Sequence, residues 1–175
     1  PVTSLPGPAA CITALTLSGM STRRFCFEAF LPSDKKEKQR ILEELKEETR
    51  TIILYEAPHR LVRTLEEILK VLGDRKMTLC RELTKKHEEA QQTTVIEALA
   101  RYESEEPKGE CVLVIEGKSF QEKEEEKKQA WDEMSIEEHV AYYENAGADQ
   151  KEAMRMAAKD RGIRRRDVYQ KLMGK

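Results

Sequence analysis

The chain has 175 residues, of which 37% are charged and 39% are hydrophobic, and its formal net charge is −2. This length is enough for one well-formed core, or for a medium-sized domain with a small appendage. No apolar run is long enough to span a membrane, and the chain does not begin with a cleavable signal. The sequence therefore predicts a soluble protein.

The cysteines indicate a reducing compartment. They are widely spaced, each in an apolar context, and they include no C-x-x-C pair and no neighbouring histidine: Cys11, Cys26, Cys80 and Cys111. Buried free thiols are therefore favoured over disulfides or metal ligands, and we expect no metal site. The expected location is the cytoplasm.

Charge is unevenly distributed along the chain. Residues 151–175 hold nine Lys/Arg and three Asp/Glu, a net charge of +6, whereas residues 1–150 hold 22 basic and 30 acidic residues, a net charge of −8. A basic tail on an acidic body favours a local contact with nucleic acid, although a solvated basic helix is the commoner cause of such a run.

The first third of the chain predicts a helix, a strand and a second helix. A rigid L-P-G-P turn at 5–8 precedes small apolar residues that form a helix ending at Gly19. Small residues let this helix start approach either another helix or a ligand bound to free backbone N–H groups. Residues 23–31 alternate as a strand, and residues 35–48 predict a charged surface helix.

Residues 51–60, T-I-I-L-Y-E-A-P-H-R, predict a buried strand that ends in polar residues, followed by an amphipathic helix from Leu61 to Leu72. Open α/β sheets present ligand-binding groups in this way, at the carboxyl ends of their strands. For this stretch alone, an ordinary strand–helix joint with a surface ion pair between Glu56 and Arg60 is the favoured alternative.

A second strand, Met77 to Glu82, also ends in charged residues, R-E-L-T-K-K-H-E. If the two strands are adjacent, their ends line one crevice with two carboxylates, three cations, a phenol and an imidazole: Glu56, Glu82, Arg60, Arg81, Lys85, Tyr55 and His59. This convergence is more specific than either stretch alone, and it favours a functional site.

The rest of the chain predicts a central strand and a helical domain. Residues 95–102 predict a helix, and 110–116 form a continuous apolar strand that should lie in the middle of the sheet. We expect an α/β domain at 1–118, a charged linker or solvent-exposed helix at 119–133, and a helix-turn-helix-like domain at 134–175.

The last predicted helix begins with Arg164, Arg165 and Arg166, which are well placed to contact phosphates. A small dimerisation or packing domain would show the same three-helix pattern, and both alternatives stay open.

Five segments resemble, in order and spacing, the carboxyl-terminal half of the bacterial rRNA small subunit methyltransferase I family: L-P-G-P-A-A (5–10), R-F-C-F-E-A-F-L-P (24–32), T-I-I-L-Y-E-A-P-H-R-L (51–61), R-E-L-T-K (81–85) and K-G-E-C-V-L-V-I-E-G (108–117). Residues 135–173 resemble the helix-turn-helix domain of the same enzymes. The family belongs to the tetrapyrrole-methylase-like, class III S-adenosylmethionine-dependent methyltransferases.

The resemblance implies the mixed-sheet, carboxyl-terminal α/β domain of the tetrapyrrole methylase fold, followed by a small all-α domain. It implies 2′-O-methylation of a cytidine in 16S rRNA on the small ribosomal subunit, in an enzyme that commonly forms homodimers. S-adenosylmethionine would contact Ala9, Ala10, Glu56 and Leu83. The family's amino-terminal domain is missing from this sequence, so we expect a fragment that is inactive alone.

Methyl transfer to a ribose hydroxyl mainly requires alignment of hydroxyl, methyl and sulfur, with loss of one proton. Glu56, Glu82 or a Lys85 kept neutral by burial are the candidate bases. Arg60 and Arg81 are candidates for phosphate or ribose contacts. A tetrapyrrole methylase and a non-catalytic RNA-binding module are the alternative functions.

Overall fold

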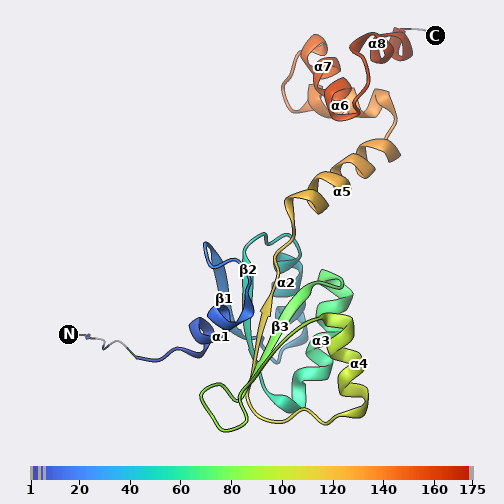
Figure 1. Ribbon diagram of the computed structural model, residues 1–175. Helices are drawn as coiled ribbons and strands as arrows, with labels where there is room; N and C mark the ends of the chain where they lie inside the picture. The colour runs from blue at the N-terminus through green and yellow to red at the C-terminus, as the bar shows by residue number, and fades with distance from the viewer. Residues whose placement is uncertain (1, 4, 6, 174–175) are drawn as a thin grey trace. The chain divides into compact units, whose positions relative to one another are not determined.

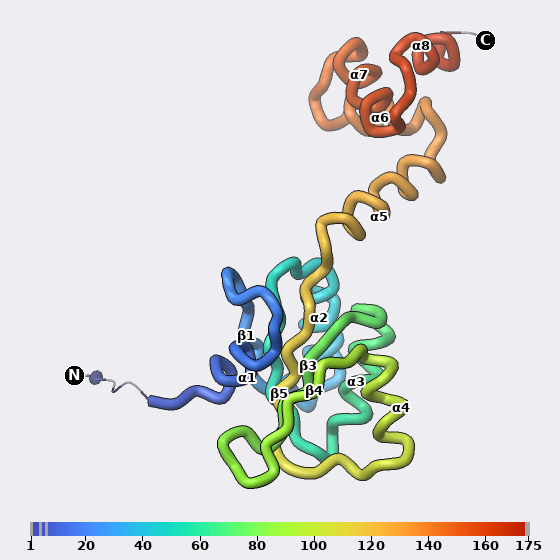
Figure 2. Tube along the Cα trace, viewed as in Figure 1, coloured from blue at the N-terminus to red at the C-terminus, as the bar shows by residue number. Residues whose placement is uncertain are grey.

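A computed structural model describes residues 2–3, 5 and 7–173 (Figures 1 and 2). The chain divides into two compact units, one up to Lys118 and one from Ser119 onward. The first unit is a five-stranded sheet with helices, and the second is helical. The predicted α/β class is confirmed. In the described part of the chain, no helix is both long and apolar enough to cross a membrane.

The first unit is built around β5. Its elements are α1 (Ala10–Ser18), β1 (Phe25–Phe30), α2 (Lys35–Lys46), β2 (Thr51–Glu56), α3 (Pro58–Leu72), β3 (Lys76–Arg81), β4 (Glu89–Thr94), α4 (Val95–Ser104) and β5 (Cys111–Ile115). The strand order is β1-β2-β5-β3-β4. All residues of β5 are buried, and the strand lies in the middle of the sheet, as its continuous apolar run predicted.

The two strands with polar ends are not adjacent, so the condition stated for a shared crevice is not met directly. β5 lies between β2 and β3 and is antiparallel to both, so β2 and β3 run in the same direction. Glu56 at the end of β2 and Arg81 at the end of β3 both pair with Cys111. The two polar ends therefore reach the same edge of the sheet, each one strand spacing of about 4.8 Å from β5.

Strand β4 was not predicted from the sequence. It is an edge strand, antiparallel to β3, and its residues are E-A-Q-Q-T-T. None of its side chains is fully buried, because the strand has a neighbour on one side only. Without an apolar alternation, the pattern used to find strands gives no signal here.

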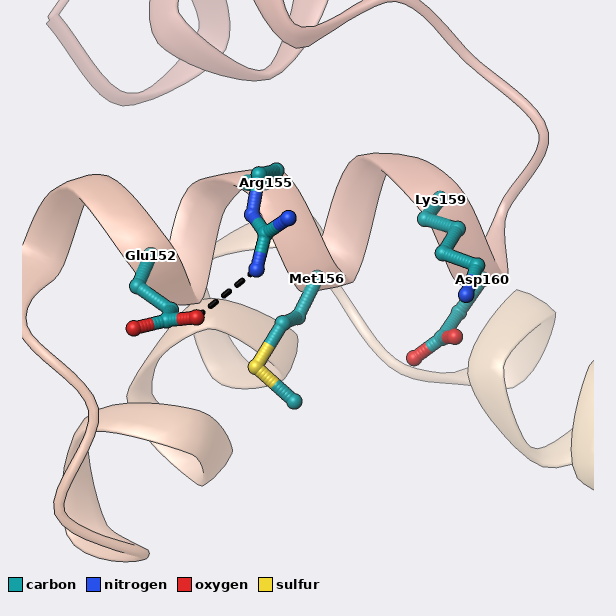
Figure 3. A pocket seen from close by; sticks show the side chains of 5 residues that line it. All are labelled: Glu152, Arg155, Met156, Lys159 and Asp160. Carbon is teal, nitrogen blue, oxygen red and sulfur yellow. Dashed lines mark hydrogen bonds and ion pairs between the residues drawn. The ribbon is translucent and has the colours of Figure 1, made fainter.

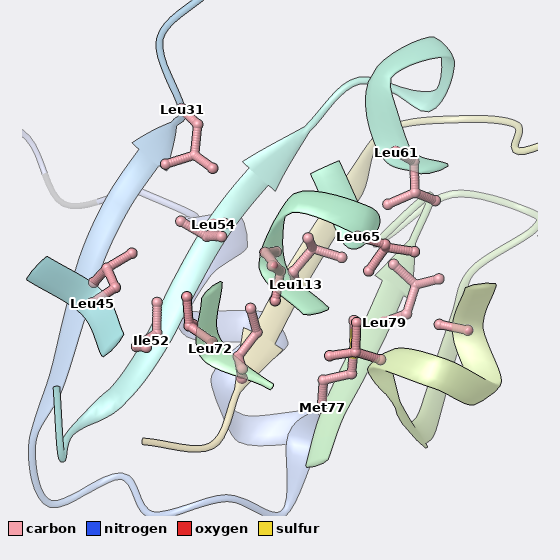
Figure 4. Close-up of a cluster of buried hydrophobic side chains, with 14 of the residues drawn as sticks. Leu31, Leu45, Ile52, Leu54, Leu61, Leu65, Leu72, Met77, Leu79 and Leu113 are labelled. Atoms are coloured by element: carbon pink, nitrogen blue, oxygen red, sulfur yellow. The ribbon is translucent and has the colours of Figure 1, made fainter. Parts of the chain in front are cut away.

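The sheet separates two apolar layers. α2, α3 and α4 cover one face, and Figure 4 shows the side chains packed between them and the sheet, including Leu54, Leu65, Leu79 and Leu113. α1 covers the other face, where Ala14 and Leu15 pack with a smaller cluster. Successive strand residues point to opposite faces of the sheet. Because helices cover both faces, Ile52, Ile53 and Leu54 of β2 are all buried.

Helices α2 and α3 are joined by a buried ion pair. We expected a charged surface helix here, but Lys38 is 6% exposed and its Nζ lies 2.5 Å from Oε2 of Glu67 on α3. Burial of a lysine requires such a partner, because an unpaired charge is costly to remove from water.

The second unit contains α5 (Phe120–Glu133), α6 (Ile136–Asn145), α7 (Gln150–Asp160) and α8 (Arg165–Met173). The residues expected as a charged linker form α5, which has no buried residue. Ser135 and Asp149 cap α6 and α7. Its core is built from α6, α7 and α8: Ile136, Val140, Ala153, Met154, Ala157, Ala158 and Val168.

His139 of α6 is the central polar residue of this unit. It is fully buried, and Trp131 stacks on it with ring centroids 4.0 Å apart and an interplanar angle of 11°. Nε of Arg161 donates a hydrogen bond to its Nδ1 (3.0 Å), and the carboxylate of Asp160 lies 3.5 Å from its Nε2. Burial, and then the neighbouring Arg161 cation, lower the pKa of His139.

We expect acid to destabilise the second unit through His139. The folded-state pKa lies below the unfolded value of about 6.5, so the unfolded state binds more protons and stability falls as pH drops through about 6.5. Denaturation followed by fluorescence of Trp131, the single tryptophan, measures this slope. His139→Gln removes the titrating group, so an unchanged pH slope in that variant would contradict the assignment.

Candidate active site

A pocket of about 400 Å³ lies at the carboxyl end of β2. Its volume falls within the usual range for small-molecule sites. The start of α1, the end of β1, the β2–α3 turn and the start of β5 supply its wall: Ala10, Phe30, Tyr55, Glu56, Ala57, Pro58, Glu110, Cys111 and Val112. Ala10 and Glu56, two of the predicted cofactor contacts, therefore line the same pocket.

The start of α1 is held against β2 by one hydrogen bond. The N–H of Cys11 donates to the hydroxyl oxygen of Tyr55 (3.0 Å). Burial raises the pKa of Tyr55, so this hydroxyl stays protonated. Ala9, the N-cap residue, has no side-chain group that could cap the helix. The small residues at this helix start bring its backbone to the pocket wall, where Ala10 lies.

Glu56 is 1% exposed and is surrounded by donors. Its Oε1 accepts a hydrogen bond from the N–H of Ala57 (2.8 Å) and lies 3.3 Å from Nε of Arg60. Its Oε2 accepts a hydrogen bond from the hydroxyl of Thr64 (2.5 Å). Arg60 also donates to the carbonyl of Leu31 (2.9 Å). The carboxylate thus links the end of β2 to the first two turns of α3 and, through Arg60, to the segment after β1.

A second hollow, of about 350 Å³, lies at the end of β3 and is lined by Arg81, Glu82, His87, Lys108 and Gly109. Glu82 and Thr84 have positive φ angles of 49° and 65°, which are uncommon for residues other than glycine. A Cβ on Gly109 would come within 2.5 Å of the Glu82 side chain, so this glycine permits the close approach.

The Glu82 carboxylate is ionised and partly exposed. Its Oε1 accepts hydrogen bonds from the N–H of Glu110 (3.0 Å) and from Nζ of Lys85 (3.1 Å). These two interactions, the backbone one first, lower the pKa of Glu82. Within the described part of the chain, no hydrogen-bond partner contacts Oε2. Glu82 therefore has one carboxylate oxygen free to meet a ligand.

Lys85 does not meet the condition under which we considered it as a base. Its side chain is 48% exposed, and Nζ lies 3.1 Å from both Glu82 and Glu110. Hydrogen bonds to Glu110 and then to Glu82 raise its pKa, so Lys85 is protonated at neutral pH. A neutral lysine would have required burial without such carboxylates.

The two arginines predicted to contact phosphate or ribose are held by internal partners. Arg81 donates to the carboxylate of Glu89, which Arg101 also contacts at 2.8 Å. Arg60 is bound to Glu56 and to the Leu31 carbonyl, as described above. These contacts leave the side chains of Arg81 and Arg60 only 19% and 28% exposed.

The remaining predicted residues lie on or near this edge of the sheet. Leu83 packs against the apolar cluster beneath α1, and His59 is exposed. Sequence reasoning did not single out Phe30, Thr64 or Glu110. Phe30 lies at the end of a predicted strand, a position that could have indicated a site residue. Nothing in the sequence marks Thr64 as the hydrogen-bond partner of Glu56, eight residues earlier.

In the second unit, Arg164, Arg165 and Arg166 are exposed at the start of α8. Arg164 forms an ion pair with Asp167 (3.2 Å). Figure 3 shows a separate hollow on α7, lined by Glu152, Arg155, Met156, Lys159 and Asp160. Its charges have both signs, and Glu152 is paired with Arg155 at 2.7 Å, so it indicates no particular ligand.

We expect the Thr64 hydroxyl to stabilise the fold by holding Glu56. Thr64→Val preserves the shape but removes the donor to a buried carboxylate, and should lower the free energy of unfolding by about 1.5–3 kcal/mol. Thr64→Ser retains the hydroxyl and serves as the control in urea denaturation. Equal losses in both variants would show that the hydrogen bond to Glu56 is not the cause.

The chain is similar to known proteins over most of its length. Residues 1–100 match the family model of the tetrapyrrole (corrin/porphyrin) methylases. The chain is 45% identical over 168 residues to ribosomal RNA small subunit methyltransferase I of Bacillus subtilis (strain 168), a match that covers 96% of this chain and 57% of that relative. The corresponding protein of Escherichia coli O157:H7 is 46% identical over 124 residues, 69% of this chain and 43% of that relative.

Among solved structures, the methyltransferase CobJ is similar with a TM-score of 0.49 and 18% identity, over 64% of this chain and 49% of that chain. The chain spans about half the length of the curated relatives it matches. With more than half of its residues matched by the family model, the chain belongs to the tetrapyrrole (corrin/porphyrin) methylase family.

Proposed function

We propose that this chain forms the second α/β domain and the helical tail of an S-adenosylmethionine-dependent enzyme that methylates the 2′ hydroxyl of a cytidine in 16S rRNA. The main support is the pocket at the end of β2, where Ala10 at a helix start and Glu56 at a strand end lie together. The names of the relatives point to small-subunit rRNA as the substrate.

The pocket suits S-adenosylmethionine in its chemistry. Tyr55, Pro58 and Val112 offer a mostly apolar wall to a flat ring, and Ala10 lets the backbone approach a ligand closely. The buried Glu56 holds the turn that forms part of this wall, through Ala57, Arg60 and Thr64. We assign Ala9, Ala10, Glu56 and Leu83 to its binding. The cofactor supplies an activated methyl group when bound.

The protein's own part in the reaction is mainly alignment. Glu56 acts as a positioning residue, because its oxygens are already engaged by Ala57, Arg60 and Thr64. Of the candidate bases, Glu82 has the accessible carboxylate, and its Oε2 would accept the proton that the ribose hydroxyl loses. Its lowered pKa makes it a weak base, consistent with a reaction driven by the leaving group.

Exposed cations of both units would contact the RNA backbone. Lys85 is charged and accessible, and so are the three arginines at the start of α8. Arg60 and Arg81, which we considered for the same task, are better suited to holding the walls of the site. A tetrapyrrole substrate would use the same fold, but it gives no reason for a helical unit with three exposed arginines at the start of its last helix.

Two further features belong to the proposal. The cysteines in the structure are free thiols, consistent with the cytoplasm, where ribosomal subunits are found. The enzyme would act as a homodimer, by analogy with the family.

Methyl transfer can be tested with a chimaera in which this chain replaces the matched segment of the Bacillus subtilis relative. We expect it to transfer label from S-adenosylmethionine to the 2′ oxygen of a cytidine in 30S subunits that lack the modification. Glu82→Gln should lower kcat about 100-fold with unchanged cofactor affinity, as expected for loss of a proton acceptor. Glu56→Ala should weaken cofactor binding.

Two outcomes would count against this proposal. If a chimaera that binds the cofactor labels no rRNA, the chain is a binding module or methylates another substrate. If label reaches a base rather than a ribose oxygen, the 2′-O assignment is wrong.

The role of the helical unit can be tested by salt dependence. Changing Arg164, Arg165 and Arg166 to Gln should weaken 16S rRNA binding and reduce the slope of log affinity against log salt by about 2–3. A matched control changes Lys35, Lys36 and Arg40 on α2, the same loss of charge beside several glutamates, and should leave the slope nearly unchanged. Equal effects in the two variants would indicate a general charge effect.

A further inference from the structure

Strand β1 contains a bulge beside the pocket. Phe27 pairs with Ile53 of β2, but Ala29 pairs with Leu54, so Glu28 is an extra residue in β1. Ala29 has a φ of 52°, in the left-handed region that residues other than glycine rarely adopt. Bulges next to functional sites commonly redirect a side chain.

The bulge brings two phenylalanines to one face of the sheet. In a regular strand Phe27 and Phe30, three positions apart, would point to opposite faces. Here Phe27 pairs with Ile53 and Phe30 pairs with Tyr55, two β2 residues on the same face. Both rings contact Tyr55 edge to face, with centroids 4.9 Å and 5.6 Å from its ring.

These three rings form what we call the aromatic edge: Phe27, Phe30 and Tyr55. Phe27 is 44% exposed and Phe30 is 57% exposed, while Phe30 and Tyr55 also line the pocket. The hydroxyl of Tyr55 is held by the N–H of Cys11, which fixes the ring that the two phenylalanines contact. The edge is thus a partly exposed aromatic surface, preorganised at the rim of the pocket.

We propose that the aromatic edge, with Phe30 as its main contact, stacks on a nucleobase of the RNA whose ribose is methylated. The inference rests on the proposed function. Proteins that recognise unpaired RNA commonly stack its bases on aromatic side chains. A base is bonded directly to its ribose, so a reacting 2′ hydroxyl in the pocket places the base near the rim.

The size of the edge favours a base over a protein partner. Two partly exposed phenylalanine rings present far less than the roughly 800 Å² per partner that a stable protein interface buries. One or two flat rings are instead what a single base needs for stacking. The edge also continues into the pocket through Phe30, which joins a stacking surface to the candidate reaction site.

The test compares Phe30→Leu with Phe30→Tyr in the 175-residue chain. Leucine keeps apolar bulk without a flat ring, whereas tyrosine keeps the ring. The probe is a single-stranded oligoribonucleotide of 16S rRNA sequence carrying fluorescent 2-aminopurine. We expect Phe30→Leu to abolish quenching and to weaken RNA binding about tenfold, and Phe30→Tyr to restore both. Phe120→Leu, at a phenylalanine that is 80% exposed on α5, is the matched control and should change neither.

Three results would overturn the proposal. Phe30→Leu and Phe120→Leu could weaken RNA binding equally. In the chimaera, Phe30→Leu could weaken S-adenosylmethionine binding while leaving the KM for 30S subunits unchanged, which would assign the edge to the cofactor's adenine. Sedimentation could show that Phe30→Leu dissociates a dimer, which would assign the edge to a second copy.

Failure of the proposed function would look different. A wild-type chimaera that transfers no label to rRNA would refute the function, while the quenching comparison would still decide whether Phe30 stacks on RNA bases. Circular dichroism of each variant checks that the fold is retained, which we expect because Phe30 lies at the exposed end of an edge strand.

Discussion

A buried carboxylate determines the shape of the candidate site. Glu56 is almost completely inaccessible, and a charge in such a place is costly unless donors surround it. The N–H of Ala57, the hydroxyl of Thr64 and the guanidinium of Arg60 supply those donors. Because Arg60 also binds the Leu31 carbonyl, the same charge orients the turn, the start of α3 and the segment after β1. Those elements are walls of the pocket.

The central strand explains how two distant stretches come to serve one edge of the sheet. β5 separates β2 from β3 and runs against both, so the polar ends of the two strands flank its first residue, Cys111. Glu110, immediately before β5, lines the first pocket and contacts Lys85 beside the second. The polar residues that end β2 and β3 therefore lie at the same edge of the sheet, although the two strands are not neighbours.

The two units have different chemistry, which fits different roles in the proposed function. The first unit holds a pocket with a buried acid and an aromatic rim, and a second hollow with an accessible carboxylate, which together suit a cofactor and a nucleoside. The second unit is a small helical domain with exposed arginines at the start of its last helix. Its core depends on small side chains such as Ala153 and Ala157, which let the helices approach closely.

The sequence by itself determined the helices and four of the five strands, because apolar periodicity and caps such as Ser135 and Asp149 act over a few residues. It also indicated Ala10 and Glu56 as candidate site residues, and both line one pocket. Tertiary structure decided the strand order, the polar edge strand β4, the exposure of Lys85 and the face on which Phe30 lies. Strand pairing, burial and register depend on contacts between residues far apart in the chain, and no local pattern encodes them.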